Sequence, residues 1–251
     1  MSRSQTESIR EFILDCVADG PKSVARQVAQ AYGISRQAAN RHLDALVDSG
    51  VLEQAGATRS KEYRLLRTAL LNREIRVTPV LNADRFWDDH MAPVLTHDRV
   101  PVRDLCRGAF GEVIRNVIAH AQAQWINVSF EMTARNIEIR VTDDGKGIFS
   151  RLAERIGVSA PRDAAALMAR HAQQRSSDFP ALHLSLLARN FEWFEIASSA
   201  VVLSYYAATD SWSIGEVASP ANGTRVSMKL CRTEKLRGAA RTGSMTDSFT
   251  R

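Results

Sequence analysis

The sequence predicts an α+β protein of two domains, and three observations support this. Residues 24–65 have the pattern of two helices around a glycine turn, followed by a hairpin. Residues 111–121 have apolar side chains at helical spacing, and residues 136–142 alternate as a half-buried strand does before two glycines. At 251 residues, the chain is long enough for two modest domains, each with its own core.

Two apolar stripes and two glycines define the N-terminal pattern. Val24, Val28 and Ala31 place an apolar face on a first helix, which Gly33 ends. Ser35 can cap the next helix by accepting from its free amides. The stripe of that helix consists of Ile34, Ala38, Leu43, Leu46 and Val47. A polar tip around Gly56 is then flanked by Val51-Leu52 and Tyr63-x-Leu65, as in a hairpin.

The string GISRQAANRHLDALVDSGVLE resembles the winged helix-turn-helix of bacterial transcription regulators. The resemblance implies that the second helix enters the major groove of double-stranded DNA and presents Arg36, Gln37, Asn40 and Arg41 to base edges or phosphates. On the hairpin, the side chains expected to reach the flanking backbone are Arg59, Lys61 and Arg64. The alternative is a helical adaptor or dimerisation domain without DNA binding. Base-reading rather than acidic side chains at the exposed positions favour DNA.

Two strings carry the candidate chemistry of the second domain. Glu112, Asn116 and His120 are each four residues apart, so they share one helix face, which is polar where a core helix would be apolar. Asp143-Asp144-Gly145-Lys146-Gly147 follows the alternating strand, and its glycines free the backbone for a tight turn. A strand that ends in a carboxylate and a glycine turn suits a bound ligand.

With ANGTRVSMKL near the C-terminal end, these strings resemble the ATP-binding domain shared by gyrases, histidine kinases, MutL and a class of chaperones. This GHKL (Bergerat) type is a two-layer α/β sandwich, and the resemblance covers residues 86–231. It implies that Asn116 is a Mg²⁺ ligand and that Asp143 receives the adenine amino group. Glu112 would polarise the attacking water where the family hydrolyses ATP. The rest of the implied adenine-nucleotide pocket is His120, Gly145, Gly147, Gly223 and Thr224.

A purely structural interpretation of the same residues is also open. Glu112 and His120 could form a solvated helix face, Asn116 could be a satisfied polar residue, and Asp143–Gly147 could be an ordinary hairpin turn. The occurrence of three motifs in the family's order favours the nucleotide pocket.

The sequence departs from the family where a glycine-rich lid should cover the phosphates. The apolar helix that follows the lid is expected as LSLLARNFEWFEI, starting at Leu184, but residues 180–183 are Pro-Ala-Leu-His. Amides that wrap phosphates usually need glycine, so we expect weak or absent ATPase activity. Arg170, His171 and Arg175 could supply phosphate contacts instead, although surface cations on an amphipathic helix are the favoured interpretation.

The predicted function is a DNA-binding transcriptional regulator whose C-terminal domain binds ATP or another adenine nucleotide with Mg²⁺ and controls DNA binding. One alternative is a GHKL-type ATPase or a serine protein kinase. A histidine kinase is disfavoured because no helical hairpin with a phosphoaccepting histidine lies between the domains. The other alternative is a degenerate nucleotide domain that acts as a dimerisation or partner-docking platform.

Composition and charge agree with a cytoplasmic globular protein. The formal net charge of +5 comes from the ends of the chain, because residues 1–67 hold ten Lys/Arg against eight Asp/Glu and residues 232–251 hold five against two. That excess is compatible with DNA contact but does not argue for it alone. Cys16, Cys106 and Cys231 are widely separated, which indicates buried thiols in a reducing compartment. No apolar run approaches the ~20 residues that span a bilayer, and no signal peptide is evident.

The predicted boundaries follow from these motifs. The winged helix-turn-helix occupies residues 1–67, and residues 68–85 form a linker or connecting strand, because Pro79 interrupts a short alternation around Ile75. The nucleotide-binding domain occupies residues 86–231 and opens with a helix at Phe86, with Trp87 in the core. Residues 232–251 form a disordered basic tail. A homodimer is left open, because winged-helix regulators usually bind paired half-sites.

Overall fold

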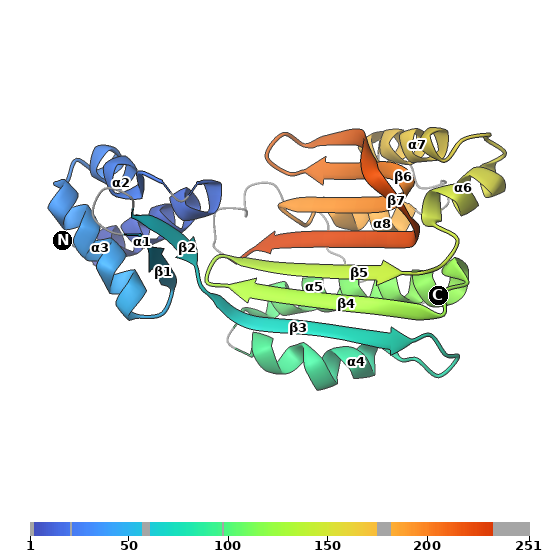
Figure 1. Ribbon diagram of the computed structural model, residues 1–251, viewed down its shortest axis with the longest axis horizontal. Coiled ribbons are helices and arrows are strands. Elements are labelled where there is room, and N and C mark those ends of the chain that lie inside the picture. The colour runs from blue at the N-terminus through green and yellow to red at the C-terminus, as the bar shows by residue number, and fades with distance from the viewer. Residues whose placement is uncertain (1–2, 21, 57–60, 97, 175–181, 233–251) are drawn as a thin grey trace. The chain divides into compact units, whose positions relative to one another are not determined.

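The computed structural model describes residues 3–20, 22–56, 61–96, 98–174 and 182–232. These residues form two compact units (Figure 1). The first unit contains the described residues up to Leu70 together with Glu131–Asn136. The second contains Leu71–Phe130 and the described residues from Ile137 onward.

The first unit has the expected two helices and hairpin, preceded by one more helix. Its elements are α1 (Arg3–Asp19), α2 (Val24–Tyr32), α3 (Arg36–Asp48), β1 (Leu52–Ala55) and β2 (Glu62–Leu65). The strands pair antiparallel, with Leu52 opposite Leu65. Helix α1 was not part of the sequence prediction, yet it buries Ile9, Ile13 and Val17 at helical spacing in the core of this unit.

Local signals at the turn between α2 and α3 are confirmed. Gly33 has φ 62°, in the left-handed region, and ends α2, while the Ser35 hydroxyl accepts from the Ala38 amide at 3.1 Å. The expected apolar face of α2 was wrong at Ala31, which is exposed. The face that packs is centred nearer Val28 and Tyr32, so Ala31 lies at its edge.

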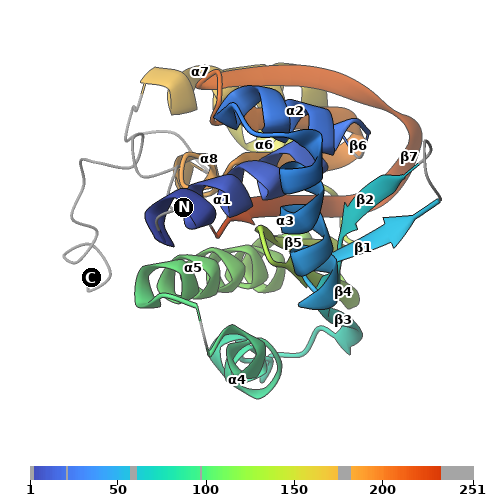
Figure 2. The ribbon, with the colours of Figure 1, turned by 90° about the vertical axis from the view of Figure 1, so that its left-hand side faces the viewer.

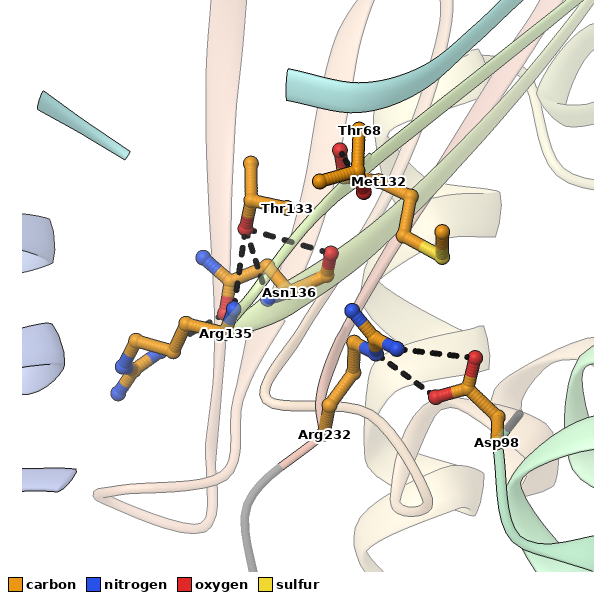
Figure 3. A network of polar contacts seen from close by, with 7 residues as sticks. All are labelled: Thr68, Asp98, Met132, Thr133, Arg135, Asn136 and Arg232. Carbon is orange, nitrogen blue, oxygen red and sulfur yellow. Dashed lines mark hydrogen bonds and ion pairs between the residues drawn. The ribbon is translucent and has the colours of Figure 1, made fainter. Parts of the chain in front are cut away.

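The turn at residues 131–136 also belongs to the first unit. Arg135 Nε donates to Asp15 Oδ1 at 2.8 Å, and Ala134 packs against the core that contains α1. The Thr133 hydroxyl accepts from the backbone amides of Arg135 and Asn136 at 3.2 and 3.0 Å (Figure 3). These bonds close the turn and anchor it within this unit.

The second unit is built on a five-stranded sheet with strand order β3-β4-β5-β7-β6. Its strands are β3 (Arg67–Arg76), β4 (Trp125–Thr133), β5 (Asn136–Asp143), β6 (Trp193–Tyr206) and β7 (Ser211–Cys231). Strands β3, β4 and β5 alternate in direction (Figure 1), and β6 pairs antiparallel with β7. The segment interpreted as a linker or a connecting strand therefore contains most of β3, and the strand expected before Asp143 is confirmed as β5.

Helices cover one face of this sheet. They are α4 (Ala83–His90), the short turn η2 (Ala92–Leu95), α5 (Val100–Asn116), the π-helical turn η3 (Val117–Ala121), α6 (Ile148–Ile156), α7 (Pro161–Gln174) and α8 (Leu182–Ala188). Alternate residues of β5, namely Ile137, Ile139 and Val141, are buried, and α5 and α8 lie on the same side of the strands (Figure 2). The unit is thus a two-layer arrangement, with Trp87 in its core as expected.

Two element boundaries differ from the sequence prediction. The helix expected at Phe86 begins at Ala83, because the Asn82 side chain caps it by accepting from the Arg85 amide at 3.0 Å. The expected helix LSLLARNFEWFEI was wrong beyond Ala188, where α8 ends. Trp193 already lies in β6, because its aromatic and β-branched neighbours Phe194 and Ile196 favour a strand and pair with β7.

A buried ion pair closes the end of β7 onto the residues before α5. Arg232 donates from Nε and a terminal nitrogen to the two Asp98 oxygens at 2.7 and 3.1 Å, and the Asp98 side chain is only 6% exposed (Figure 3). Burial, with the nearby Asp98 charge, raises the pKa of Cys106 to about 12, so this thiol stays protonated at neutral pH. Arg232 had been assigned to the predicted tail, and residues 233–251 lie outside the described part of the chain.

No helix among the described residues is both long and apolar enough to cross a membrane.

Candidate functional site

A cavity of about 440 Å³ opens in the second unit at the ends of α5 and β5. Apolar side chains from several elements form much of its wall, including Val113, Val117, Val141, Ile148, Leu152, Leu184 and Val226. Of the polar residues named from the sequence, the cavity is lined by Asn116, His120, Asp143, Gly147 and Thr224. Tertiary folding therefore brings parts of all three sequence motifs to one place.

Asp143 lies at the end of β5 and is only 5% exposed. Burial raises the pKa of its carboxyl, as does the Asp144 charge, while hydrogen bonds from the Gly145 and Thr224 backbone amides act in the opposite direction. Among the described residues, no cation pairs with this carboxylate. A carboxylate has about four acceptor positions, so Asp143 can still accept from a ligand N–H.

Gly145 and Gly223 allow the backbone to close around Asp143. A Cβ on Gly145 would overlap the Ala121 carbonyl oxygen, and one on Gly223, at φ +85°, would overlap the Asp143 carbonyl oxygen. These glycines line a second cavity, of about 470 Å³. Both positions need glycine because another backbone segment approaches closely. The resemblance had placed Gly145 and Gly223 in the nucleotide pocket, and neither is among the described residues that line the cavity beside Asp143.

Thr224 connects the cavity to helix α6. Its hydroxyl accepts from the Ile148 amide at 2.9 Å, directly after Gly147. The Ser198 hydroxyl of β6 donates to the Gly223 carbonyl at 3.0 Å, which links β6 to the residue before Thr224. The Gly-Thr string and the Asp-Gly turn, far apart in the chain, therefore form one hydrogen-bonded unit.

Asn116 and His120 reach the cavity from the end of α5. Asn116 Nδ2 donates to the Glu112 backbone oxygen at 2.8 Å and to Glu112 Oε1 at 3.1 Å, which leaves its Oδ1 as the atom suited to a cation. His120 lies in the wider π-helical turn η3, whose last carbonyl, that of Ala121, accepts from the Lys146 amide at 3.0 Å. That bond joins the helix end to the glycine turn.

Glu112 is not among the described residues that line the cavity. Its carboxylate accepts from Asn116 and forms an ion pair with Arg115 at 3.0 Å. A general base must reach the water that it activates, and this carboxylate is instead held by two neighbours on its own helix. In this arrangement the Glu112 carboxylate is not placed to act on a molecule in the cavity.

Sequence reasoning missed the charged residues of α6, although the string SRLAERI after the glycine turn is amphipathic. Arg151, Glu154 and Arg155 all line the cavity. Arg170 and His171, considered for phosphate contacts, lie on α7 and are not among the described lining residues. Arg175, Pro180 and Ala181 lie outside the described residues, and His183 is exposed at the start of α8.

A Mg²⁺ site made by the protein alone is not evident. The described residues contain no group of three or more His, Cys, Asp or Glu side chains that could hold a metal ion. Asn116 Oδ1 fits as a single protein ligand to a Mg²⁺ that phosphate oxygens and water otherwise surround.

The first unit presents polar side chains on α3. Arg36, Gln37, Asn40 and Arg41 are all exposed, while Ala39, Leu43 and Leu46 of the same helix are buried. Arg64 of β2 is exposed, Lys61 is partly buried, and Arg59 lies outside the described residues. Helix α3 thus has an apolar inner face and a donor-rich outer face, as a recognition helix requires.

Comparison with known families identifies this first unit. Residues 9–53 match the model of the winged helix-turn-helix DNA-binding family, from within α1 to β1. No curated protein matches the chain. The family match agrees with the observed helices and hairpin, so this part of the chain is a winged helix-turn-helix DNA-binding domain.

Proposed function

We propose that the protein is a DNA-binding transcriptional regulator whose second unit binds an adenine nucleotide. The observation that carries the nucleotide part is Asp143, a buried carboxylate at a cavity wall with no cation partner among the described residues. The Gly145 and Thr224 amides already donate to this carboxylate, and the acceptor positions that remain suit an exocyclic amine. The adjacent apolar walls suit the faces of a purine ring.

The size of the cavity supports this proposal. About 440 Å³ lies within the range of roughly 300–1,000 Å³ typical of small-molecule sites. The same cavity is lined by apolar side chains such as Val141 and Val226 and by polar ones such as Asn116, His120 and the α6 arginines. This combination fits a ligand with a flat base and a polar, charged remainder.

We expect nucleotide binding with weak or no hydrolysis. Glu112 is held by Arg115 and Asn116, and the sequence before α8 lacks the lid glycines. Incubation with labelled ATP should therefore release little or no phosphate and form no phosphoprotein. Turnover that disappears in Glu112→Gln would support an ATPase or kinase instead.

Regulation requires that the nucleotide bind one DNA-binding state more tightly than another, because equal binding shifts no equilibrium. The test is a gel shift on DNA from upstream of its own gene, with and without ATP and Mg²⁺, repeated with Asp143→Asn. We expect the nucleotide to change the affinity of the native protein for DNA and to have no effect on the variant. Equal affinities of the native protein would refute the regulatory part while leaving DNA binding intact.

A further inference from the structure

Helix α6 contributes two arginines to the cavity wall. Arg151 and Arg155 are four residues apart, so they lie on the same face of the helix, one turn apart. Leu152 and Ala153 are buried, and Phe149 is inaccessible to solvent, so the helix is anchored by its apolar face. The arginine side chains therefore extend from a rigid support.

The position of α6 relative to Asp143 is set by hydrogen bonds. The Ile148 amide donates to Thr224, whose own backbone amide bonds to Asp143, and the Arg151 amide donates to the Gly147 carbonyl at 3.2 Å. At a rise of about 1.5 Å per residue, Arg155 begins about 10 Å further along the helix than Ile148. The two arginines therefore lie up to about two helical turns beyond the hydrogen bond that fixes the start of α6 near Asp143.

Both guanidinium groups are available to an anion. Neither has a carboxylate partner within ion-pair distance among the residues that the structure describes. Glu154 also lines the cavity, so Arg151, Glu154 and Arg155 together have a net charge of +1. His120 lines the same cavity. A guanidinium can donate two parallel hydrogen bonds to a phosphate and needs no glycine in the backbone to do so.

We propose that Arg151 and Arg155 bind the phosphates of the nucleotide, in the role that the amides of a glycine-rich lid would otherwise have. This inference rests on the proposed adenine-nucleotide site and adds the residues that recognise its phosphates, which would make the site prefer ADP or ATP over adenosine. Arg151 is partly buried and Arg155 is exposed, so Arg151 contributes more.

The test compares adenosine and ADP binding to the full chain by calorimetry, in EDTA so that no metal contributes. We expect the native protein to bind ADP roughly ten times more tightly than adenosine, or better. Arg151→Gln should remove most of this preference by weakening ADP binding several-fold, and Arg155→Gln should remove less, with adenosine binding unchanged. The double variant should bind both ligands alike, and Arg170→Gln on α7 is the matched control.

Several results would overturn this assignment. Equal affinity of the native protein for adenosine and ADP would remove the phosphate role but keep the adenine site. An unchanged ADP preference in the double variant, or an equal loss in Arg170→Gln, would place the phosphate contacts elsewhere. A double variant that melts normally but loses adenosine binding would assign the arginines to the base, and a native protein that binds neither ligand would refute the adenine site as well.

Discussion

The substitution Asp143→Asn tests the proposed pocket most directly. It keeps the size of the side chain but removes the negative charge that would accept from the adenine amine. The single Asn oxygen must then serve the Thr224 amide and the Gly145 amide, which now donates to Asp143 Oδ1 at 2.8 Å, as well as any ligand. Binding should weaken without loss of the fold.

The expected magnitude follows from the strength of a charge-assisted hydrogen bond. Loss of about 2 kcal/mol raises the Kd about 30-fold. Ligand at 100 times the native Kd stabilises the native protein by about 2.7 kcal/mol, whereas the variant at the same concentration gains only about 0.9 kcal/mol. At about 2–4 °C per kcal/mol for a chain of this size, the Tm shift falls from about 5–11 °C to about 2–4 °C.

The unliganded variant should be at least as stable as the native protein at neutral pH. Because burial raises the folded-state pKa of Asp143 above its ordinary value of 3.8, protonation favours the fold, and this stabilisation is lost as the pH rises through the folded pKa. Asn mimics the protonated form. Its advantage should therefore shrink as the pH falls from neutral toward 3.8, where the native carboxyl becomes protonated in both states.

The assay is thermal melting with and without ATP or ADP, at pH 7.5 and at lower pH. Asp163→Asn, at an exposed position in the first turn of α7, is the matched control and should keep the full ligand shift. A native protein whose Tm does not respond to any adenine nucleotide would favour a degenerate domain. An undiminished shift in Asp143→Asn would show that the carboxylate does not contact the ligand.

Three further predictions concern the supports of the site and the DNA-binding surface. Asp98→Ala should cost about 3 kcal/mol in urea unfolding, because it removes the buried carboxylate that accepts two hydrogen bonds from Arg232, whereas Asp163→Ala at an exposed position should cost far less. Equal effects of the two substitutions would refute a stabilising role for this ion pair. Gly223→Ala should lower the free energy of unfolding by about 1–3 kcal/mol or more, because the added Cβ would overlap the Asp143 carbonyl oxygen at a positive φ. The control Gly215→Ala should be tolerated, because a Cβ there meets no atom within 4 Å, and a native-like Tm for Gly223→Ala would contradict this prediction. Arg36→Ala and Arg41→Ala, at exposed positions of α3, should each weaken DNA binding by about 1–3 kcal/mol in gel shifts without changing the Tm. The control Gln30→Ala, at an exposed position of α2, should leave DNA binding unchanged. Unaltered DNA affinity in both arginine variants would favour an adaptor role.

Local signals made much of the fold predictable. Gly33 needs a left-handed conformation, and Ser35 caps the helix that follows it, so the helix-turn-helix could be located from a few consecutive residues. The alternation that ends at Asp143 likewise specified β5. The prediction failed beyond Ala188, because an apolar run is compatible with a helix and with a buried strand, and pairing with β7 decided between them.

The candidate site was predictable only where neighbouring residues of a single motif place its functional side chains. The sequence by itself determined a helix-turn-helix with a donor-rich outer face, and a strand that ends in a carboxylate and a glycine turn, because caps, turns and periodicity depend on near neighbours. Only the tertiary structure decided that Thr224 bonds to the start of α6, that Glu112 is held by Arg115, and that Arg151 and Arg155 enter the cavity wall. Those facts depend on segments far apart in the chain, because burial and hydrogen bonding are set by whichever segments pack together.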